Sequence, residues 1–259
     1  MTRFLILLFI STVSLFNLRA ADLIQQADSA YTADEFEKAI GLYSEALTSE
    51  GTSAELLYNM GNCYYRLGKY GKAILMYERA LRLDPTFTDA RENLAFVNSK
   101  IVDRPGERGT ILSNALDSMA NKAKSDAWAW IAFAFFLLTI IGICLYIFTT
   151  SIPLRKTGFF GALICILVCG TAIFFAFRAA AISEADDVAI VLSPSTILST
   201  APRTPSDRSL EAMLLHEGTK VTIIDSVLNH ADSVPSLWLD VNVDNTHRAW
   251  INAADVERI

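Results

Sequence analysis

The sequence predicts a multidomain protein in which an all-α helical repeat array, a two-helix transmembrane hairpin and a small all-β barrel follow one another. Three observations lead to this prediction. The first part of the chain repeats itself, the middle contains two long apolar runs without a charged side chain, and the last part has short strand-like runs separated by turn-forming residues. Hydrophobic residues make up 52% of the 259 residues, which is high for a soluble protein.

A short apolar run near the N-terminus, residues 4–16, follows the basic Arg3 and leads to the small residue Ala20. The run is too short to span a bilayer, and this order of features is typical of a secretory signal peptide. We therefore expect residues 1–20 to be a signal peptide, with the mature chain beginning outside the cytoplasm. The alternative is an uncleaved anchor.

The next part of the chain matches itself when it is displaced by 34 residues, which is the length of a tetratricopeptide repeat. Small residues in such repeats permit two antiparallel helices to approach closely, and aromatic residues fill the space between neighbouring helix pairs. The matched pairs are Ala27 and Gly61, Phe36 and Tyr70, Ala39 and Ala73, Tyr43 and Tyr77, and Ala46 and Ala80.

The chain resembles the tetratricopeptide family from Ala20 to Pro85. We expect repeats over residues 20–53 and 54–87 and a capping helix within residues 86–101, so that the array covers residues 21–101. The first repeat is the degenerate copy, and a linker over residues 102–126 follows the array. In the second repeat the signature positions are held by Leu57, Gly61, Tyr64, Gly68, Tyr70, Ala73, Tyr77, Ala80 and Pro85.

The resemblance implies a concave face that binds extended peptides or helices. Asn62 and Arg66 resemble part of a clamp for a terminal carboxylate, although Ile24 stands where that clamp would have a lysine. The alternative is that this face is simply solvent-exposed and that its aromatic side chains are half-buried for packing. The residues nominated for the partner-binding face are Tyr58, Asn62, Tyr65, Arg66, Phe96 and Lys100.

Two uncharged runs, residues 127–149 and 158–177, each reach the roughly 20 residues that a helix needs to cross a bilayer. We expect transmembrane helices over residues 127–149 and 158–178. A pair of buried helices in a soluble core is the alternative, but both helices would then be apolar on every face. The connecting residues 150–157 are too few for a domain and carry two positive charges, which favours a cytoplasmic turn. We therefore expect both flanking domains on the periplasmic side of a bacterial inner membrane.

Residues 183–259 contain short apolar runs of strand length, typical of a small barrel. The segment 215–221 and the strands around Trp238 and Trp250 resemble bacterial SH3-like domains. The chain departs from that family at residues 245–249, where we expect Asn245 to supply a left-handed turn in place of glycine. The resemblance nominates Trp238 and Trp250 as a ligand face, and the alternative is that both rings close the barrel core.

No catalytic, cofactor-binding or metal-binding motif is recognisable in the chain. Its three histidines lack metal-ligand spacing, and there is no P-loop, dinucleotide fingerprint or nucleophile elbow. The segment from residue 183 carries twelve acidic and five basic residues, and residues 21–126 carry sixteen and twelve, so nucleic acid is not an expected partner. We expect a non-enzymatic protein without a cofactor.

The order of these segments resembles the BatE-type proteins of the Bacteroides aerotolerance operons. The resemblance implies partnership with membrane-anchored von Willebrand factor A domain proteins and a cytoplasmic MoxR-type AAA ATPase, in an envelope complex linked to oxygen or stress tolerance. The resulting hypothesis is a membrane-anchored adaptor or scaffold. The alternative is a cell-wall anchor or sensor whose SH3-like domain binds peptidoglycan through an aromatic platform.

Overall fold

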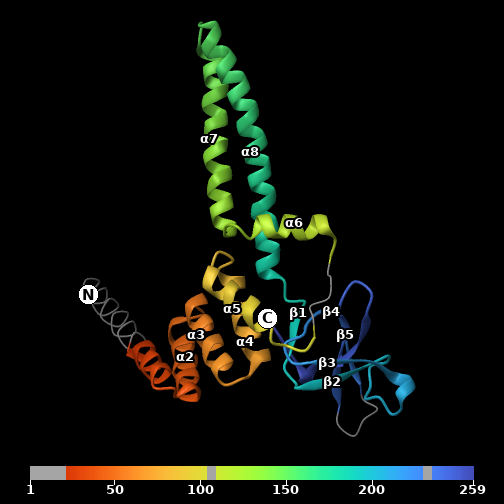
Figure 1. The fold of residues 1–259 in the computed structure, drawn as a ribbon. Helices are drawn as coiled ribbons and strands as arrows, with labels where there is room; N and C mark the ends of the chain where they lie inside the picture. Colours follow the sequence, from red (N-terminus) through yellow and green to blue (C-terminus); the bar gives the residue numbers. More distant parts are fainter. Residues whose placement is uncertain (1–21, 104–108, 230–234) are drawn as a thin grey trace, which may run out of the picture. The chain divides into compact units, whose positions relative to one another are not determined.

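The computed structural model describes residues 22–103, 109–229 and 235–259, so the expected signal peptide lies outside the described residues. The chain forms two compact units. The first combines the N-terminal helices with the C-terminal segment Asp186–Ile259, and the second consists mainly of residues Gly109–Ala185 (Figure 1). The first unit is therefore discontinuous, because its two parts are separated in sequence by the second unit.

The N-terminal helices form an array in which each labelled helix packs against the next (Figure 1). Within each helix pair the turn contains a residue with positive φ, Asp34 at 60° and Gly68 at 71°. These two positions are 34 residues apart, so the repeat period extends to the backbone of the turns. The helices span residues 22–32, Phe36–Glu50 (α2), Ala54–Arg66 (α3), Tyr70–Leu83 (α4) and Thr88–Asn98 (α5).

The small residues of the repeats lie in the core of the array, as the sequence predicts. A Cβ atom added at Gly61 would lie 2.6 Å from the ring of Tyr77, whereas one added at the exposed Gly41 would meet nothing within 4 Å. The ring of Tyr77 is itself buried. Close approach between α3 and α4 therefore requires glycine at position 61. The fully buried alanines of the array are Ala27, Ala39, Ala46, Ala73, Ala80 and Ala90.

The C-terminal segment forms an antiparallel sheet of seven strands in the order β3-β2-β6-β5-β4-β1-β7. The predicted barrel is not present, because β3 and β7 are edge strands that do not pair with each other and the sheet stays open. The hydrophobic cluster of the sheet consists of buried Val, Leu, Ile and Ala side chains. The strands are Val188–Val191 (β1), Ser195–Ser199 (β2), Glu211–His216 (β3), Lys220–Asn229 (β4), Ser236–Asn242 (β5), Arg248–Asn252 (β6) and Val256–Arg258 (β7).

The turn before β6 is built differently from the sequence expectation. Asn245 does not have a positive φ, since Asp34 is the one non-glycine residue with this conformation in the described part of the chain. Instead, the Asp244 carboxylate accepts hydrogen bonds from the backbone N–H groups of Thr246 at 2.7 Å and His247 at 2.8 Å. A turn formed with the Asp244 side chain therefore takes the place of the expected left-handed turn at Asn245.

The sheet packs against the helical array within the first unit. Ile190 of β1 is fully buried in the same hydrophobic cluster as Ile74 of α4. Lys220 of β4 donates to both carboxylate oxygens of Glu78 at 2.9 and 3.0 Å, and Arg79 pairs with Glu257 at 2.8 Å. Array and sheet thus share a core and an ionic border instead of forming separate domains.

The second unit contains three helices, α6 (Ile111–Ala120), α7 (Ser125–Phe148) and α8 (Ile152–Glu184). Helix α6 lies inside the segment expected as a linker, and α8 begins inside the expected turn, where Pro153 is tolerated near the helix start. At one crossing, Cβ atoms added at Gly142 and Gly158 would lie 2.9 and 2.7 Å from the carbonyl oxygen of the opposite glycine. These glycines therefore permit contact within the hairpin.

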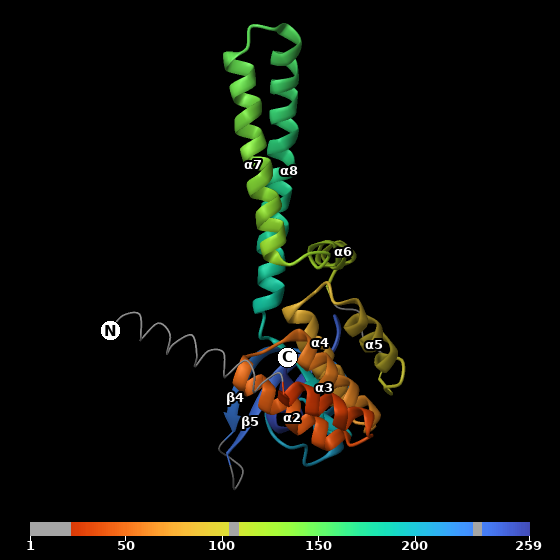
Figure 2. The same ribbon diagram turned by 90° about the vertical axis from the view of Figure 1, so that its left-hand side faces the viewer.

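Both α7 and α8 are long and apolar enough to cross a membrane. They run side by side in both views (Figures 1 and 2). Their large apolar side chains point mostly outward, while the seam between them is made of small residues, as in helix pairs that pack in lipid. The buried residues of the two helices are Ala132, Thr139, Gly142, Gly158, Ala162, Ala172 and Ala179.

Candidate functional site: the α3–α5 face

Aromatic side chains from α3 and α5 meet on one face of the array. The rings of Tyr65 and Phe96 are 5.7 Å apart in an edge-to-face arrangement, and the rings of Tyr58 and Phe87 are 5.0 Å apart. Phe96 remains 50% exposed. The structure therefore brings together four of the six residues nominated from the sequence on what we call the α3–α5 face (Tyr58, Asn62, Tyr65, Asn93 and Phe96).

The orientation of the Asn62 amide is fixed by two donors. Its Oδ1 accepts a hydrogen bond from the Tyr77 hydroxyl at 2.7 Å and another from Asn93 Nδ2 at 2.9 Å. Asn93 Nδ2 also donates to the Tyr58 hydroxyl at 3.2 Å. The Asn62 NH2 group has no hydrogen-bond partner within the described residues and is a donor for a ligand's carboxylate or carbonyl oxygen.

The first repeat contains the same hydrogen bond. The Tyr43 hydroxyl donates to Asp28 Oδ1 at 2.5 Å, and both residues are 34 positions before Tyr77 and Asn62. Burial raises the pKa of Tyr43, with a further contribution from the Asp28 carboxylate, and burial also raises the pKa of Tyr77. Both hydroxyls therefore stay protonated and act as fixed donors.

The two cationic residues nominated for the site, Arg66 and Lys100, contact different parts of the array. Arg66 is directed toward the first repeat, where its Nη2 is 2.7 Å from Asp34 Oδ1 and its guanidinium lies 4.6 Å from the centroid of Phe36. Lys100 stays beside the α3–α5 face, with its Nζ 5.0 Å from the centroid of Phe96. Lys100 thus lies beside the exposed ring of Phe96, while Arg66 links the two repeats.

Asn93 and Tyr77 contribute to the site but were not nominated from the sequence. The repeat period could have identified the Tyr77–Asn62 pair, because both positions have a polar or aromatic counterpart 34 residues earlier in Asp28 and Tyr43. Asn93 lies on the capping helix α5, which is not part of a complete third repeat. Its contact with α3 depends on tertiary packing and leaves no periodic signal.

The two tryptophans nominated for a ligand face of the C-terminal domain have different environments. Trp238 is only 3% exposed, and its Nε1 donates to Ser236 Oγ at 2.9 Å. Trp250 is half-buried in β6 and pairs with Ser199 of β2. An aromatic platform for peptidoglycan would therefore have to use Trp250.

Titratable groups are dispersed elsewhere in the molecule. Within residues 22–103, 109–229 and 235–259, no three His, Cys, Asp or Glu side chains are arranged to hold a metal ion. Burial raises the pKa of the Cys63 thiol to about 11, so this cysteine remains an unreactive packing residue at neutral pH.

Comparison with known proteins supports the assignment of the helical array. Residues 54–87 match the family model of the tetratricopeptide repeat. Over 71 residues, 27% of this chain, the sequence is 34% identical to "Protein SGT1 homolog" of Oryza sativa subsp. japonica. This stretch spans only 19% of the length of that relative. The chain thus contains a tetratricopeptide repeat, as the sequence predicts, and repeats of this kind serve protein–protein interaction.

Proposed function

We propose that the protein is a non-enzymatic, membrane-anchored adaptor that binds a protein partner on the α3–α5 face. The observation that carries this proposal is the fixed amide of Asn62, which is hydrogen-bonded to Asn93 of α5. The same helix carries the half-exposed ring of Phe96, and Lys100 Nζ lies 5.0 Å from the centroid of that ring. An oriented donor, an apolar surface and a cation together suit a peptide segment that offers a carboxylate or carbonyl oxygen next to an apolar side chain.

The membrane anchor in this proposal is the hairpin of α7 and α8. Its large side chains point outward, for example Phe136, Ile141 and Phe160, which are each more than half exposed. Such surfaces are stable in lipid and unfavourable in water. Moreover, the segments before and after the hairpin fold into one unit, so both lie on the same side of the membrane. Two crossings satisfy this requirement.

The partner class follows from the resemblance to BatE-type proteins and not from a contact in the structure. We propose von Willebrand factor A domain membrane proteins, associated with a MoxR-type AAA ATPase, as the assembly that this adaptor joins in the periplasm, with a role in oxygen or stress tolerance. The C-terminal sheet, by its resemblance to SH3-like domains, would supply a second contact. Two tethered contacts raise the effective concentration of the second binding event.

Site-specific photocrosslinking in cells tests the proposal. A photoreactive amino acid at Phe96 is expected to capture a von Willebrand factor A domain protein, and the same group at Gly41, which is exposed on α2, is expected not to capture it. The Asn62→Ala substitution should reduce capture at position 96 because it removes the oriented donor. Equal capture from positions 41 and 96, or capture unaffected by the loss of Asn62, would contradict the binding face.

A further inference from the structure

Helix α6 presents large apolar side chains on its outside. Ile111 is 91% exposed, Leu112 71% and Met119 49%. With the exposed Ala115 they lie on one side of the helix, since residues three and four apart share a face. We call these four residues the α6 apolar face. Solvent contact is unfavourable for such a face, which points to a partner surface.

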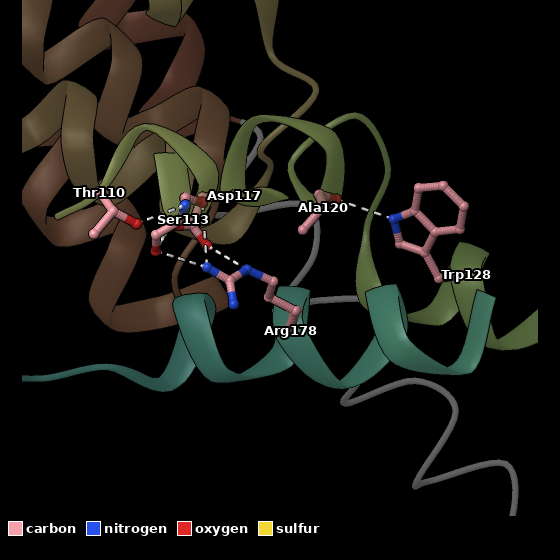
Figure 3. Close-up of polar contacts among 6 residues, drawn as sticks. All are labelled: Thr110, Ser113, Asp117, Ala120, Trp128 and Arg178. Carbon is pink, nitrogen blue, oxygen red and sulfur yellow. Dashed lines mark hydrogen bonds and ion pairs between the residues drawn. The ribbon is translucent and has the colours of Figure 1, made fainter. Parts of the chain in front are cut away.

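The opposite, polar side of α6 is bound by an arginine of the hairpin. Arg178 Nε donates to Asp117 Oδ1 at 2.7 Å (Figure 3). Its Nη2 donates to the hydroxyl of Ser113 at 2.9 Å and to the carbonyl oxygen of the same residue at 3.2 Å. These contacts define which side of α6 faces α8, and they leave the α6 apolar face without a partner in the described part of the chain.

Both ends of α6 are also fixed. Thr110 caps the N-terminus, because its Oγ1 accepts a hydrogen bond from the Ser113 N–H at 3.1 Å. At the other end, Trp128 Nε1 in the first turn of α7 donates to the carbonyl oxygen of Ala120 at 3.0 Å (Figure 3). Helix α6 is therefore held to both α7 and α8 and has a defined height along the hairpin.

That height corresponds to the border of the apolar hairpin segments. Arg178 directly follows the uncharged run of α8, and Trp128 is the second residue of the apolar run of α7. Arginine and tryptophan at the ends of transmembrane helices lie at the headgroup level of a bilayer. Helix α6 crosses α8 instead of continuing along it, as both views show (Figures 1 and 2).

We propose that α6 is an interfacial helix that lies in the plane of the membrane surface and inserts Ile111, Leu112 and Met119 among the lipids. This inference rests on the proposed membrane hairpin. The occupant of the α6 apolar face is lipid, because the Arg178 and Trp128 contacts hold α6 at the level where the lipid-facing surfaces of α7 and α8 end. A helix of this length binds membranes weakly by itself, so these contacts supply its position.

Photocrosslinking of the full chain in phosphatidylethanolamine and phosphatidylglycerol vesicles tests this inference. A diazirine amino acid replaces Leu112 or, as the matched control, Asn114, which is exposed on the polar side of α6. A third variant carries the group at Leu137, in the middle of α7. Mass spectrometry of the products distinguishes lipid adducts from protein adducts. We expect strong lipid adducts at positions 137 and 112 and several-fold fewer at position 114.

The other outcomes are separable. Lipid adducts at position 137 with none at position 112 would overturn the interfacial helix and leave the membrane hairpin intact. Adducts at position 112 to a second copy of the chain would make the α6 apolar face a contact between copies, and would likewise overturn the inference. Absence of lipid adducts at position 137 would contradict the hairpin anchor itself, and with it the basis of this inference.

Discussion

At the scale of single residues, the array depends on a tyrosine that is held from two directions. The ring of Tyr77 packs on Gly61, and its hydroxyl donates to Asn62, the next residue of α3. A movement of the ring away from α3 would break this hydrogen bond. The glycine that permits helix packing and the asparagine of the binding face are thus coupled through one buried side chain.

The coupling predicts opposite effects for the same substitution at two glycines. Gly61→Ala should destabilise the protein by about 1–3 kcal/mol, because the new methyl group overlaps a ring that cannot move freely. Gly41→Ala should stabilise it by about 0.5–1 kcal/mol, since its site in α2 is open and alanine favours helix. Urea unfolding of the full chain in detergent micelles measures both changes. Equal effects at the two positions would contradict the packing described at Gly61.

At the scale of helices and strands, the sequence predicted the elements that have strong periodicity and missed those without it. The 34-residue repeat and the two uncharged runs predicted the array and the hairpin. Helix α6 was expected as linker because it is short, and only its Thr110 cap signals its start. Strand β2 begins and ends with Ser, and β3 begins with Glu and ends with His. Closure of the sheet depends on edge pairing that no local pattern encodes.

The border between sheet and array predicts a dependence on pH at Asp103. Its carboxylate accepts hydrogen bonds from the Thr219 hydroxyl and the His216 backbone N–H, both at 2.7 Å. Burial alone would raise the pKa of Asp103, but these hydrogen bonds and the His216 ring more than compensate, so this pKa lies below its usual value. The ionised carboxylate therefore stabilises the folded state near neutral pH, and this contribution disappears as the pH falls through the lowered pKa.

Asp103→Asn should consequently lower the free energy of unfolding by about 1–3 kcal/mol at neutral pH. The difference from the unmodified protein should begin to shrink as the pH falls below about 4, where Asp103 of the unfolded chain becomes protonated, and should vanish as the pH falls through the lowered pKa of the folded state. Urea unfolding across a pH series checks this. The control is Asp187→Asn, an exposed carboxylate without a side-chain partner among the described residues. A difference that stays constant down to acidic pH would contradict the role of ionised Asp103.

At the scale of the whole molecule, the first unit is assembled from two segments that flank the hairpin. Gly218, with a φ of 87°, fits against Ile74 and Ile101, where an added Cβ atom would lie 2.8 Å from both side chains. Arg82 Nη1 donates to the carbonyl oxygen of Ile259 at 2.6 Å. Contacts of this kind between residues far apart in sequence could not be read from the order of the segments, which indicated independent domains.

A chain in which a flexible glycine-serine linker replaces residues 109–185 should therefore remain folded and unfold in a single transition. Residues 22–103 alone should be less stable, because Ile74 and Ile101 lose their cover from the sheet. Calorimetry compares the two proteins. Two separate transitions in the linked protein, with the helical one unchanged from that of residues 22–103 alone, would show that array and sheet fold independently.

The discontinuity of the first unit also has a consequence for biosynthesis. Helices α2 to α5 leave the ribosome before the hairpin. The side of α4 that packs against the sheet therefore stays exposed until the last strands have been synthesised. In a membrane-inserted chain those strands reach the array only when both α7 and α8 have been threaded. If only one of α7 and α8 crossed the membrane, the sheet would lie on the side opposite to the helical array. Ile74 would then remain exposed. In such a chain, completion of the first unit would therefore require both crossings.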